Sequence, residues 1–380
     1  MEKLTQPQYP YSIIASMKLG ANPPKTRPKR EVRLEACTLC QINCETCYMR
    51  QWNYCGLKAG YLSFANFAKF LKLNPEVTDI ELSNSGEIFL NPDLLKIIKL
   101  AYEKGVLLTA YNGVNFNTVS DEVLEGLVKY RFGTFTISLD GYDQASYGSY
   151  RQGANFNNVI NNIERLNFYK EKYKSYFSPH IVWKYVIIKA TDSYHGIRKM
   201  KALAKKIGIN EVRFAADWGG YIPKNLAMIK RETKLDYSQK STADNNSKHS
   251  NRWCYQLWNS PQINWDGRFF GCCQNADWPF DGKLFETPLR DFLNSDQMLR
   301  TKKMLSGGEY DPKLPCANCK FYQTMRSEGN FFKLSELEKN IQDSSQMIEN
   351  RYLKKMQKDL AHLAPNLPLV IKDHLEKSLR

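Results

Sequence analysis

The chain has 380 residues, of which 42% are hydrophobic and 24% are charged, and its formal net charge is +15. This composition excludes an intrinsically disordered protein, which would lack the apolar residues needed for a core. The sequence contains no apolar run long enough to span a membrane and no secretory signal, so we expect a cytoplasmic protein. Its ten cysteines then suggest metal or redox chemistry, because the cytoplasm keeps thiols reduced.

The positive charge by itself would suit an anionic partner such as nucleic acid. Lys and Arg are mixed with Asp and Glu along the predicted helices, and the one mostly basic stretch runs from Lys25 to Arg33. No nucleic-acid-binding motif accompanies the charge. We therefore expect solvated helix faces and neither a nucleic-acid nor a membrane partner.

Six βα units are predicted between residues 30 and 216, because short β-rich apolar runs alternate there with helical patterns. The predicted strands are 31–36, 78–83, 106–110, 134–139, 180–188 and 211–215, and the predicted helices are 63–72, 92–104, 120–130, 155–170 and 194–207. Six such units close only part of a barrel. The expected fold class is therefore α/β, with a partial (β/α)6 TIM-like barrel.

The rest of the chain is predicted to form four further segments. They are an N-terminal extension (1–29), a polar linker (217–250), a small domain (251–330) and a C-terminal helical tail (331–380), helical to about residue 363. In the small domain, Asp266-Gly267 between two apolar runs predicts a β-hairpin, and residues 288–304 have a helical pattern.

Three cysteines, Cys40, Cys44 and Cys47, follow the first predicted strand in a C-x3-C-x2-C pattern. This places them at the carboxyl end of the sheet, where active sites lie in such folds. Thiolates select zinc, copper(I) or iron–sulfur clusters, and three ligands leave one metal position open on a four-iron cluster. The alternative is a structural zinc loop completed by Cys37 or Cys55.

This cysteine pattern resembles that of the radical S-adenosylmethionine enzymes, and two further motifs extend the resemblance. Ser85-Gly86-Glu87 is similar to the Gly-Gly-Glu motif of the family. The resemblance implies that Gly86 and Glu87 hold the amino group of S-adenosylmethionine. Tyr111-Asn112-Gly113 resembles the Thr-Asn-Gly segment of the family, which makes Asn112 a further cofactor-binding candidate.

The later motifs in the barrel add two more cofactor-binding candidates. Ser138 opens a segment that resembles the Ser-x-Asp-Gly motif of the family, and Arg151 matches a basic residue that reaches the cofactor's carboxylate in related enzymes. A guanidinium suits that bidentate task. The sequence departs from the family at Thr46, where an aromatic residue near the adenine is common.

A second set of cysteines lies in the small domain: Cys254, Cys272, Cys316 and Cys319. Four thiolates suit either a tetrahedral zinc or a cluster. After a radical S-adenosylmethionine core, this spacing resembles the SPASM auxiliary-cluster domain in its shortened twitch form. The resemblance therefore implies two 4Fe-4S clusters in the chain, and Cys37, Cys55 and Cys273 are interpreted as thiols that bind no metal.

The resemblance implies an oxidoreductase that cleaves S-adenosylmethionine reductively and uses the 5′-deoxyadenosyl radical to take a hydrogen atom from a substrate. A flavodoxin or ferredoxin would donate the first electron, and the auxiliary cluster would accept the second. The catalytic acid or base is unknown. Asp217 and Asp277 could serve as a base, although an ordinary loop carboxylate is the more favoured interpretation of each.

The substrate class rests on a weaker argument. The twitch arrangement is similar to that of 2-deoxy-scyllo-inosamine dehydrogenase and also to that of peptide-modifying enzymes. Only 39 residues precede Cys40, fewer than a leader-binding domain requires, which favours a small molecule such as a sugar or aminocyclitol. The alternatives are modification of a ribosomally made peptide and a non-enzymatic metal- and RNA-binding protein.

Overall fold

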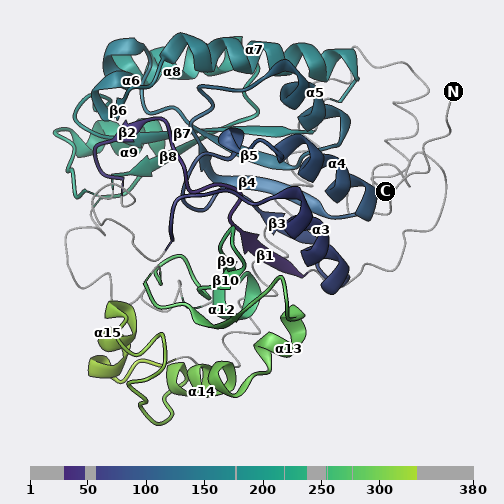
Figure 1. Cartoon of the computed structure of the whole chain (residues 1–380). Helices are drawn as coiled ribbons and strands as arrows, with labels where there is room; N and C mark the ends of the chain where they lie inside the picture. Colours follow the sequence, from purple (N-terminus) through teal and green to yellow (C-terminus); the bar gives the residue numbers. More distant parts are fainter. Residues whose placement is uncertain are drawn as a thin grey trace, which may run out of the picture.

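Alternating strands and helices build a mostly parallel sheet with helices packed along its outer side (Figure 1). The computed structural model describes residues 30–47, 57–175, 178–217, 219–237, 254, 256–275 and 277–331. Within these residues the main sheet has nine strands in the order β11-β10-β9-β1-β3-β4-β5-β7-β8. Its parallel part, from β1 to β8, is the predicted partial barrel.

All six predicted barrel strands and all five predicted barrel helices are present. The strands are β1 (Glu31–Leu34), β3 (Asp79–Glu81), β4 (Leu107–Val114), β5 (Thr134–Ser138), β7 (His180–Ile187) and β8 (Glu211–Ala216). The helices are α3 (Phe64–Leu73), α4 (Leu94–Lys104), α5 (Asp121–Lys129), α7 (Phe156–Lys172) and α8 (Tyr194–Lys206). Smaller elements of this region are β2 (Asn43–Cys44), η1 (Ile88–Leu90), α6 (Gln144–Tyr150) and β6 (Arg151–Gln152). A further helix, α9 (Leu226–Thr233), lies within residues 217–250, which were predicted as a polar linker without a helix.

Local chemistry explains why the barrel helices begin where they do. Four of them have a Ser or Asn N-cap whose side chain accepts a backbone N–H of the first turn: Ser63, Ser120, Asn155 and Ser193. Helix α4 ends at Gly105, whose φ of 82° is the left-handed conformation that glycine adopts without strain. These caps therefore set the first residue of four barrel helices and the last residue of α4.

The two faces of the barrel sheet differ in chemistry. On β1, Val32 and Leu34 are fully buried in the hydrophobic core, whereas the alternate residue Arg33 is on the opposite face, in register with Glu81 of β3. Nearer the β8 edge of the sheet, Ser138 of β5 is in register with Lys184 of β7. The face turned away from the core is therefore lined with polar and charged side chains.

The small domain continues the barrel sheet instead of standing apart from it. Its hairpin consists of β9 (Gln262–Ile263) and β10 (Arg268–Phe269), which are antiparallel as predicted, followed by β11 (Phe280–Lys283). Strand β9 pairs in parallel with β1. The sequence indicated the hairpin but not this pairing, which sets the small domain directly beside the first barrel strand.

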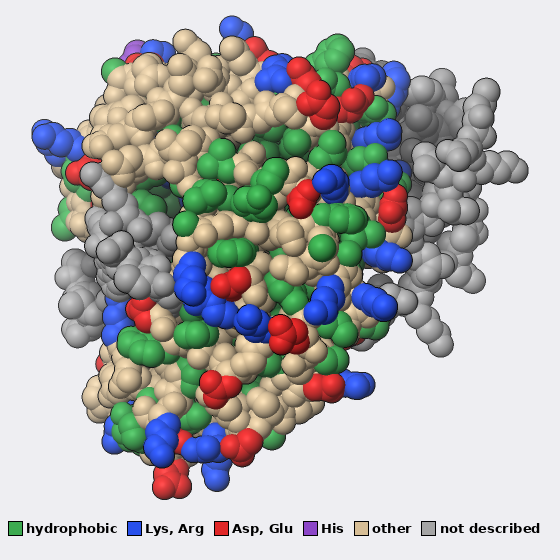
Figure 2. Space-filling model, viewed as in Figure 1, with side chains coloured by type: hydrophobic (Ala, Val, Ile, Leu, Met, Phe, Trp, Pro, Cys, Tyr) green, Lys and Arg blue, Asp and Glu red, His purple; other side chains and the backbone are tan. Residues whose placement is uncertain are grey.

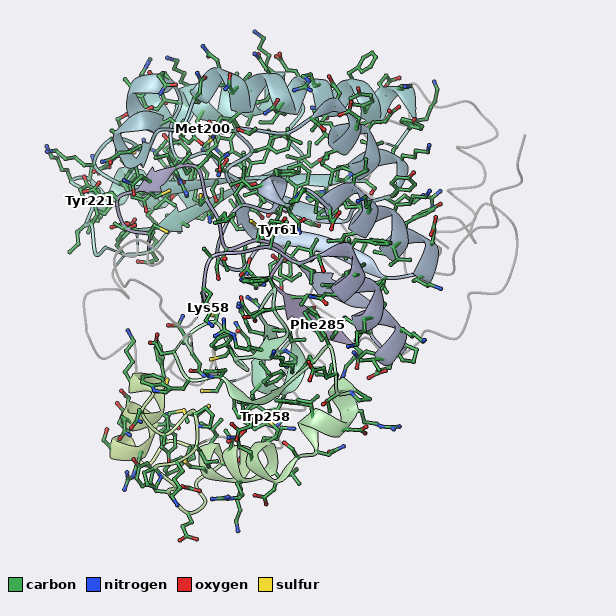
Figure 3. The ribbon with its side chains drawn as sticks, viewed as in Figure 1. Lys58, Tyr61, Met200, Tyr221, Trp258 and Phe285 are labelled. Atoms are coloured by element: carbon green, nitrogen blue, oxygen red, sulfur yellow. The ribbon has the colours of Figure 1, made fainter. Side chains whose placement is uncertain are left out.

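Further contacts fix the seam between the barrel and the small domain. Figure 3 shows Lys58 and Phe285 at the level where the two meet. The Trp265 indole donates to the Lys58 carbonyl at 3.2 Å, and the ring of Phe285 meets Phe70 of α3 edge to face at 6.4 Å. Because both hydrogen bonding and apolar packing cross the seam, the small domain is held against the barrel.

The prediction of a single helix over residues 288–304 is wrong. Residues 288–304 form two helices, α13 (Leu289–Leu293) and α14 (Asp296–Leu305). The break occurs because Ser295 takes an extended conformation and caps α14 by accepting the N–H of Met298. The remaining helices of this domain are α12 (Gln256–Asn259) and α15 (Lys320–Glu328).

Several predictions fall on residues outside the described ranges. These are the N-terminal extension, Cys55, residues 218 and 238–250 of the linker, and the helical tail beyond Phe331. Among the described residues, no helix is both long and apolar enough to cross a membrane. On the face shown in Figure 2, Lys and Arg side chains alternate with Asp and Glu over the described surface.

Candidate metal and cofactor centres

Four cysteines of the small domain surround one cavity. Cys254 precedes α12, Cys272 follows β10, and Cys316 and Cys319 precede α15. The cavity spans about 350 Å³, part of it open to solvent, and its other lining residues are mostly apolar: Leu257, Phe270, Gly271, Asn275, Leu305 and Tyr322. The tertiary structure thus assembles thiols that are up to 65 positions apart (319 − 254) into one site.

The surroundings of these four thiols favour a cluster over a single ion. No three His, Cys, Asp or Glu side chains of the described residues converge closely enough to hold one metal ion. Burial raises the pKa of Cys254 to about 12 and the pKa of Cys316 well above its usual value. The thiolate forms therefore need a compensating positive group inside the cavity, which the iron of a four-iron cluster would supply.

The three barrel cysteines lie on the loop that follows β1. Cys40 is exposed and Cys44 is buried, and the backbone N–H of Cys47 donates to the carbonyl of Cys44 at 3.2 Å. Cys44 belongs to β2, which pairs with β6 and sets Cys44 in register with Arg151. Three thiols on an open loop suit a cluster with one accessible iron, in contrast to the enclosed four-thiol cavity.

Arg151 contacts the cluster loop directly. Its Nη1 donates to Cys44 Sγ at 3.1 Å, and its Nε donates to Asp140 Oδ2 at 2.8 Å. Asp140 is fully buried and its other oxygen accepts the N–H of Val186 at 2.8 Å. Removing one partner of such a partly buried ion pair costs about 3–5 kcal/mol of folding free energy, because the other charge then stays buried without a partner.

The Ser-Gly-Glu segment packs against the same loop. A side chain at Gly86 would place its Cβ 2.3 Å from the carbonyl oxygen of Cys37, so only glycine fits there. Glu87 is 1% exposed and its Oε2 accepts the N–H of Asn115 at 2.5 Å. Burial raises the pKa of Glu87 to about 7, despite the backbone donors around it. A carboxyl group in this setting suits the binding of a cofactor amino group.

The other two predicted cofactor contacts lie further across the sheet. Asn112 donates from Nδ2 to Asn84 Oδ1 at 3.3 Å, and its carbonyl accepts Lys184 Nζ at 3.1 Å. Ser138 ends β5 and is 4% exposed. Lys184, which contacts Asn112, was not among the predicted site residues and is the only lysine or arginine of strand β7.

The two carboxylates considered as bases differ in position. Asp217 is 5% exposed and its Oδ2 accepts the N–H of Tyr221 at 3.2 Å, whereas Asp277 is exposed on a loop.

Thr46 forms a hydrogen bond between its hydroxyl and that of Tyr150. Cys273 is not among the residues that line the thiol cavity, and its N–H donates to Gln256 Oε1 at 2.8 Å.

Comparison with known families identifies the small domain. Residues 254–320 match the family model SPASM, described as an iron-sulfur cluster-binding domain. These residues form a SPASM domain. The matched range begins at the first cysteine of the thiol cavity and includes the last, so the SPASM domain contains the whole cavity. A search of curated proteins finds no match to the chain.

Solved structures share the overall fold at low sequence identity. Streptococcus suis SuiB bound to S-adenosylmethionine is 14% identical, with a TM-score of 0.53 over 83% of this chain and 75% of SuiB. SuiB bound to its precursor peptide SuiA is 13% identical, with the same TM-score over 83% of this chain and 74% of that one. Native anSMEcpe with bound AdoMet is 13% identical, with a TM-score of 0.51 over 77% and 87% of the two chains. These similarities show that the chain shares the overall fold of these structures.

Proposed function

We propose that this chain is a radical S-adenosylmethionine enzyme with two 4Fe-4S clusters. The observation that carries the proposal is the pair of separate thiol sites, a three-cysteine loop at the carboxyl end of β1 and a four-cysteine cavity in the SPASM domain. The bound S-adenosylmethionine of SuiB and of anSMEcpe, which share this fold, supports the same cofactor here.

The residues around the three-cysteine loop have distinct tasks in this proposal. Cys40, Cys44 and Cys47 hold the first cluster, and the carboxyl group of Glu87 holds the amino group of the cofactor. Together the bound cluster and cofactor supply the radical that removes a hydrogen atom from the substrate. The barrel residues position the cofactor and keep water away from it.

For the overall reaction we favour oxidation or rearrangement of a small molecule such as a sugar or aminocyclitol. Four thiols fill the coordination of the auxiliary cluster, so it has no iron free for substrate and is suited to accept an electron. The proposal includes a cytoplasmic location and a flavodoxin or ferredoxin as the electron donor. The second candidate is modification of a ribosomal peptide, which the precursor-bound SuiB structure favours.

The first test is the iron and sulfide content after anaerobic reconstitution. We expect about eight irons in the wild type and about four in a variant with Cys40, Cys44 and Cys47 all changed to Ala, which also loses cleavage of S-adenosylmethionine. Negligible iron together with bound zinc would overturn the proposal. An aminocyclitol and a precursor-like peptide, each tested for stimulated cofactor cleavage, then separate the two substrate classes.

A further inference from the structure

Helix α8 has five basic residues and no acidic one. Together with α9, which packs against it, the total is seven Lys or Arg residues and one acidic residue, Glu232. Helix α5, for comparison, has three acidic residues and one lysine. Two further carboxylates, Asp143 and Asp236, form ion pairs with lysines of α8 and α9, which leaves a surplus of four positive charges (7 − 3). This part of the surface therefore attracts anionic partners.

Three large apolar side chains are exposed at the same place. Tyr194 at the start of α8 is 49% exposed, Leu226 at the start of α9 is 44% exposed, and Ile222 in the loop before α9 is 67% exposed. A single exposed apolar residue is ordinary, but a group of them within a charged rim is typical of a protein interaction site.

Contacts between the helices and their loops bring these residues together. The ring of Tyr194 lies between two guanidinium groups, with Arg198 of α8 at 5.9 Å and Arg231 of α9 at 5.8 Å from its centroid. Asp192, two positions before Tyr194, accepts the N–H of Lys224 on its Oδ2 at 2.8 Å. Lys224 lies midway in the chain between the other two apolar residues, so the three form one patch.

This patch adjoins the open thiol site. The loop of residues 219–225 leads from it to the three-cysteine loop, because a Cβ on Gly219 would lie 3.1 Å from Cγ2 of Thr46, which is between Cys44 and Cys47. Figure 3 shows Tyr221 at the end of the molecule where Figure 1 places α8, α9 and β2. Helix α15, beside the SPASM cavity, lies at the lower end (Figure 1). A protein bound to the patch is therefore beside the barrel cluster.

The basic and apolar groups of this patch form what we call the docking surface: Tyr194, Arg198, Ile222, Lys224, Leu226 and Arg231. We propose that it binds a small acidic electron-carrier protein, of the flavodoxin or ferredoxin class, which reduces the barrel cluster. The carrier loses one electron and the barrel cluster gains it, and no bond forms or breaks. Opposite charge steers the approach of the carrier, and the apolar side chains make the close contact.

The position of the docking surface fits an electron carrier better than a peptide substrate. A peptide has to reach the cofactor beside Glu87, whereas a carrier has only to come close to the cluster. Helix α8 lies on the outer side of the barrel (Figure 1). Electron-transfer complexes have small interfaces, below about 1,200 Å², so a few side chains are sufficient. The inference rests on the proposed function, because it takes the barrel cluster as the electron acceptor.

The test compares two reductants of the reconstituted protein: a reduced acidic flavodoxin, which has to bind, and dithionite, which acts without docking. Formation of 5′-deoxyadenosine from S-adenosylmethionine measures each rate. For Arg198→Glu/Arg231→Glu at about 0.1 M salt we expect kcat/KM for flavodoxin to fall about 10-fold, because charge steering is lost. The rate with dithionite should stay at the wild-type value. Ile222→Ser should give a smaller loss with flavodoxin that does not depend on the salt concentration.

Lys205→Glu/Lys206→Glu is the matched control, because it changes the net charge by the same amount on the same helix. Both lysines are exposed in the last turn of α8. They lie about 16 Å along the helix axis from Tyr194, which exceeds the screening length of about 10 Å at 0.1 M salt. This variant should react with flavodoxin as the wild type does.

An unchanged kcat/KM for flavodoxin in Arg198→Glu/Arg231→Glu would overturn the inference, and so would an equal fall in the rate with dithionite or in the control variant. Unchanged reaction with flavodoxin but lost stimulation by a precursor-like peptide would assign the surface to a substrate instead. If the wild type holds iron but forms no 5′-deoxyadenosine even with dithionite, the proposed function itself fails. That result is distinct, because it needs no change at the docking surface.

Discussion

The two thiol sites of this protein differ in enclosure and in the chemistry of their neighbours. The SPASM cavity has four cysteines and is lined mainly by apolar groups such as Leu257 and Phe270. The barrel loop has three cysteines, one of them exposed, and its neighbours include the charged groups of Arg151 and Glu87. The same type of side chain therefore lies in two different environments.

The number of thiols and the polarity around them together decide what each site can do. An enclosed, fully ligated cluster can exchange electrons but has no iron for a ligand. An open site flanked by a carboxyl and a guanidinium group can bind a zwitterion such as the methionyl part of the cofactor. We infer that electron transfer and cofactor binding are separable functions in this chain, and the predictions below test that separation.

The largest expected effect follows from Cys316→Ser. Removing one thiol ligand from the SPASM cavity should prevent the auxiliary cluster from forming, so the iron content falls from about eight to about four. Product formation should stop while affinity for S-adenosylmethionine stays at the wild-type value, as measured by iron analysis and equilibrium binding. Cys273→Ser is the matched control, because Cys273 neighbours a lining cysteine but does not line the cavity, and it should keep full iron. If Cys316→Ser also lost cofactor affinity, the two sites would not be independent.

A smaller effect is expected from Gly86→Ala at the open site. The new Cβ would meet the backbone of Cys37 and Leu39 at 2.3 and 2.6 Å, and a backbone contact cannot be relieved by rotating a side chain. We expect a loss of about 3 kcal/mol in the free energy of unfolding and a weakened barrel cluster, with the SPASM cluster retained. Denaturant unfolding and iron analysis measure the two effects.

The control for that change is Gly148→Ala in α6. Its Cβ would approach only the flexible end of Gln144, at 3.0 Å, and alanine favours the helix. This variant should be as stable as the wild type or slightly more so. A Gly86→Ala protein of normal stability would show that the loop can move away from Cys37.

The smallest expected effect is a pH dependence that originates beneath the open site. Burial raises the pKa of Glu35 from 4.5 to about 8, against the opposing effect of donors from Ser85, Cys37 and Gly86. At pH values between 4.5 and about 8, Glu35 keeps its proton in the native state, whereas it releases this proton in the unfolded chain. Stability should therefore fall as the pH rises through this window, by at most about 1.4 kcal/mol per pH unit.

Urea unfolding of the protein before reconstitution, at pH 5.5 and pH 7.5, measures this dependence. Glu35→Gln carries no titrating group at this position, so its stability should change less between the two pH values than that of the wild type. Equal slopes for the two proteins would show that Glu35 is ionised in the native state throughout.

Much of this architecture is determined by the sequence alone. The alternation of apolar strands and capped helices predicted the partial barrel. This was possible because strand and helix periodicity depend only on residues that are close together in the sequence. The cysteine spacing of the barrel loop is also local: three ligands within eight positions must lie on one loop. The same holds for the hairpin at Asp266-Gly267, which turn chemistry specifies.

The tertiary structure decided what depends on residues that are far apart in the chain. Pairing of β9 with β1 set the SPASM domain beside the barrel, and folding gathered Cys254 and Cys319 around one cavity. Register between β5 and β7 brought Lys184 to Ser138, and the pairing of β2 with β6 brought Arg151 to Cys44. No local pattern encodes these contacts, because each depends on how strands from different βα units align when the core is buried.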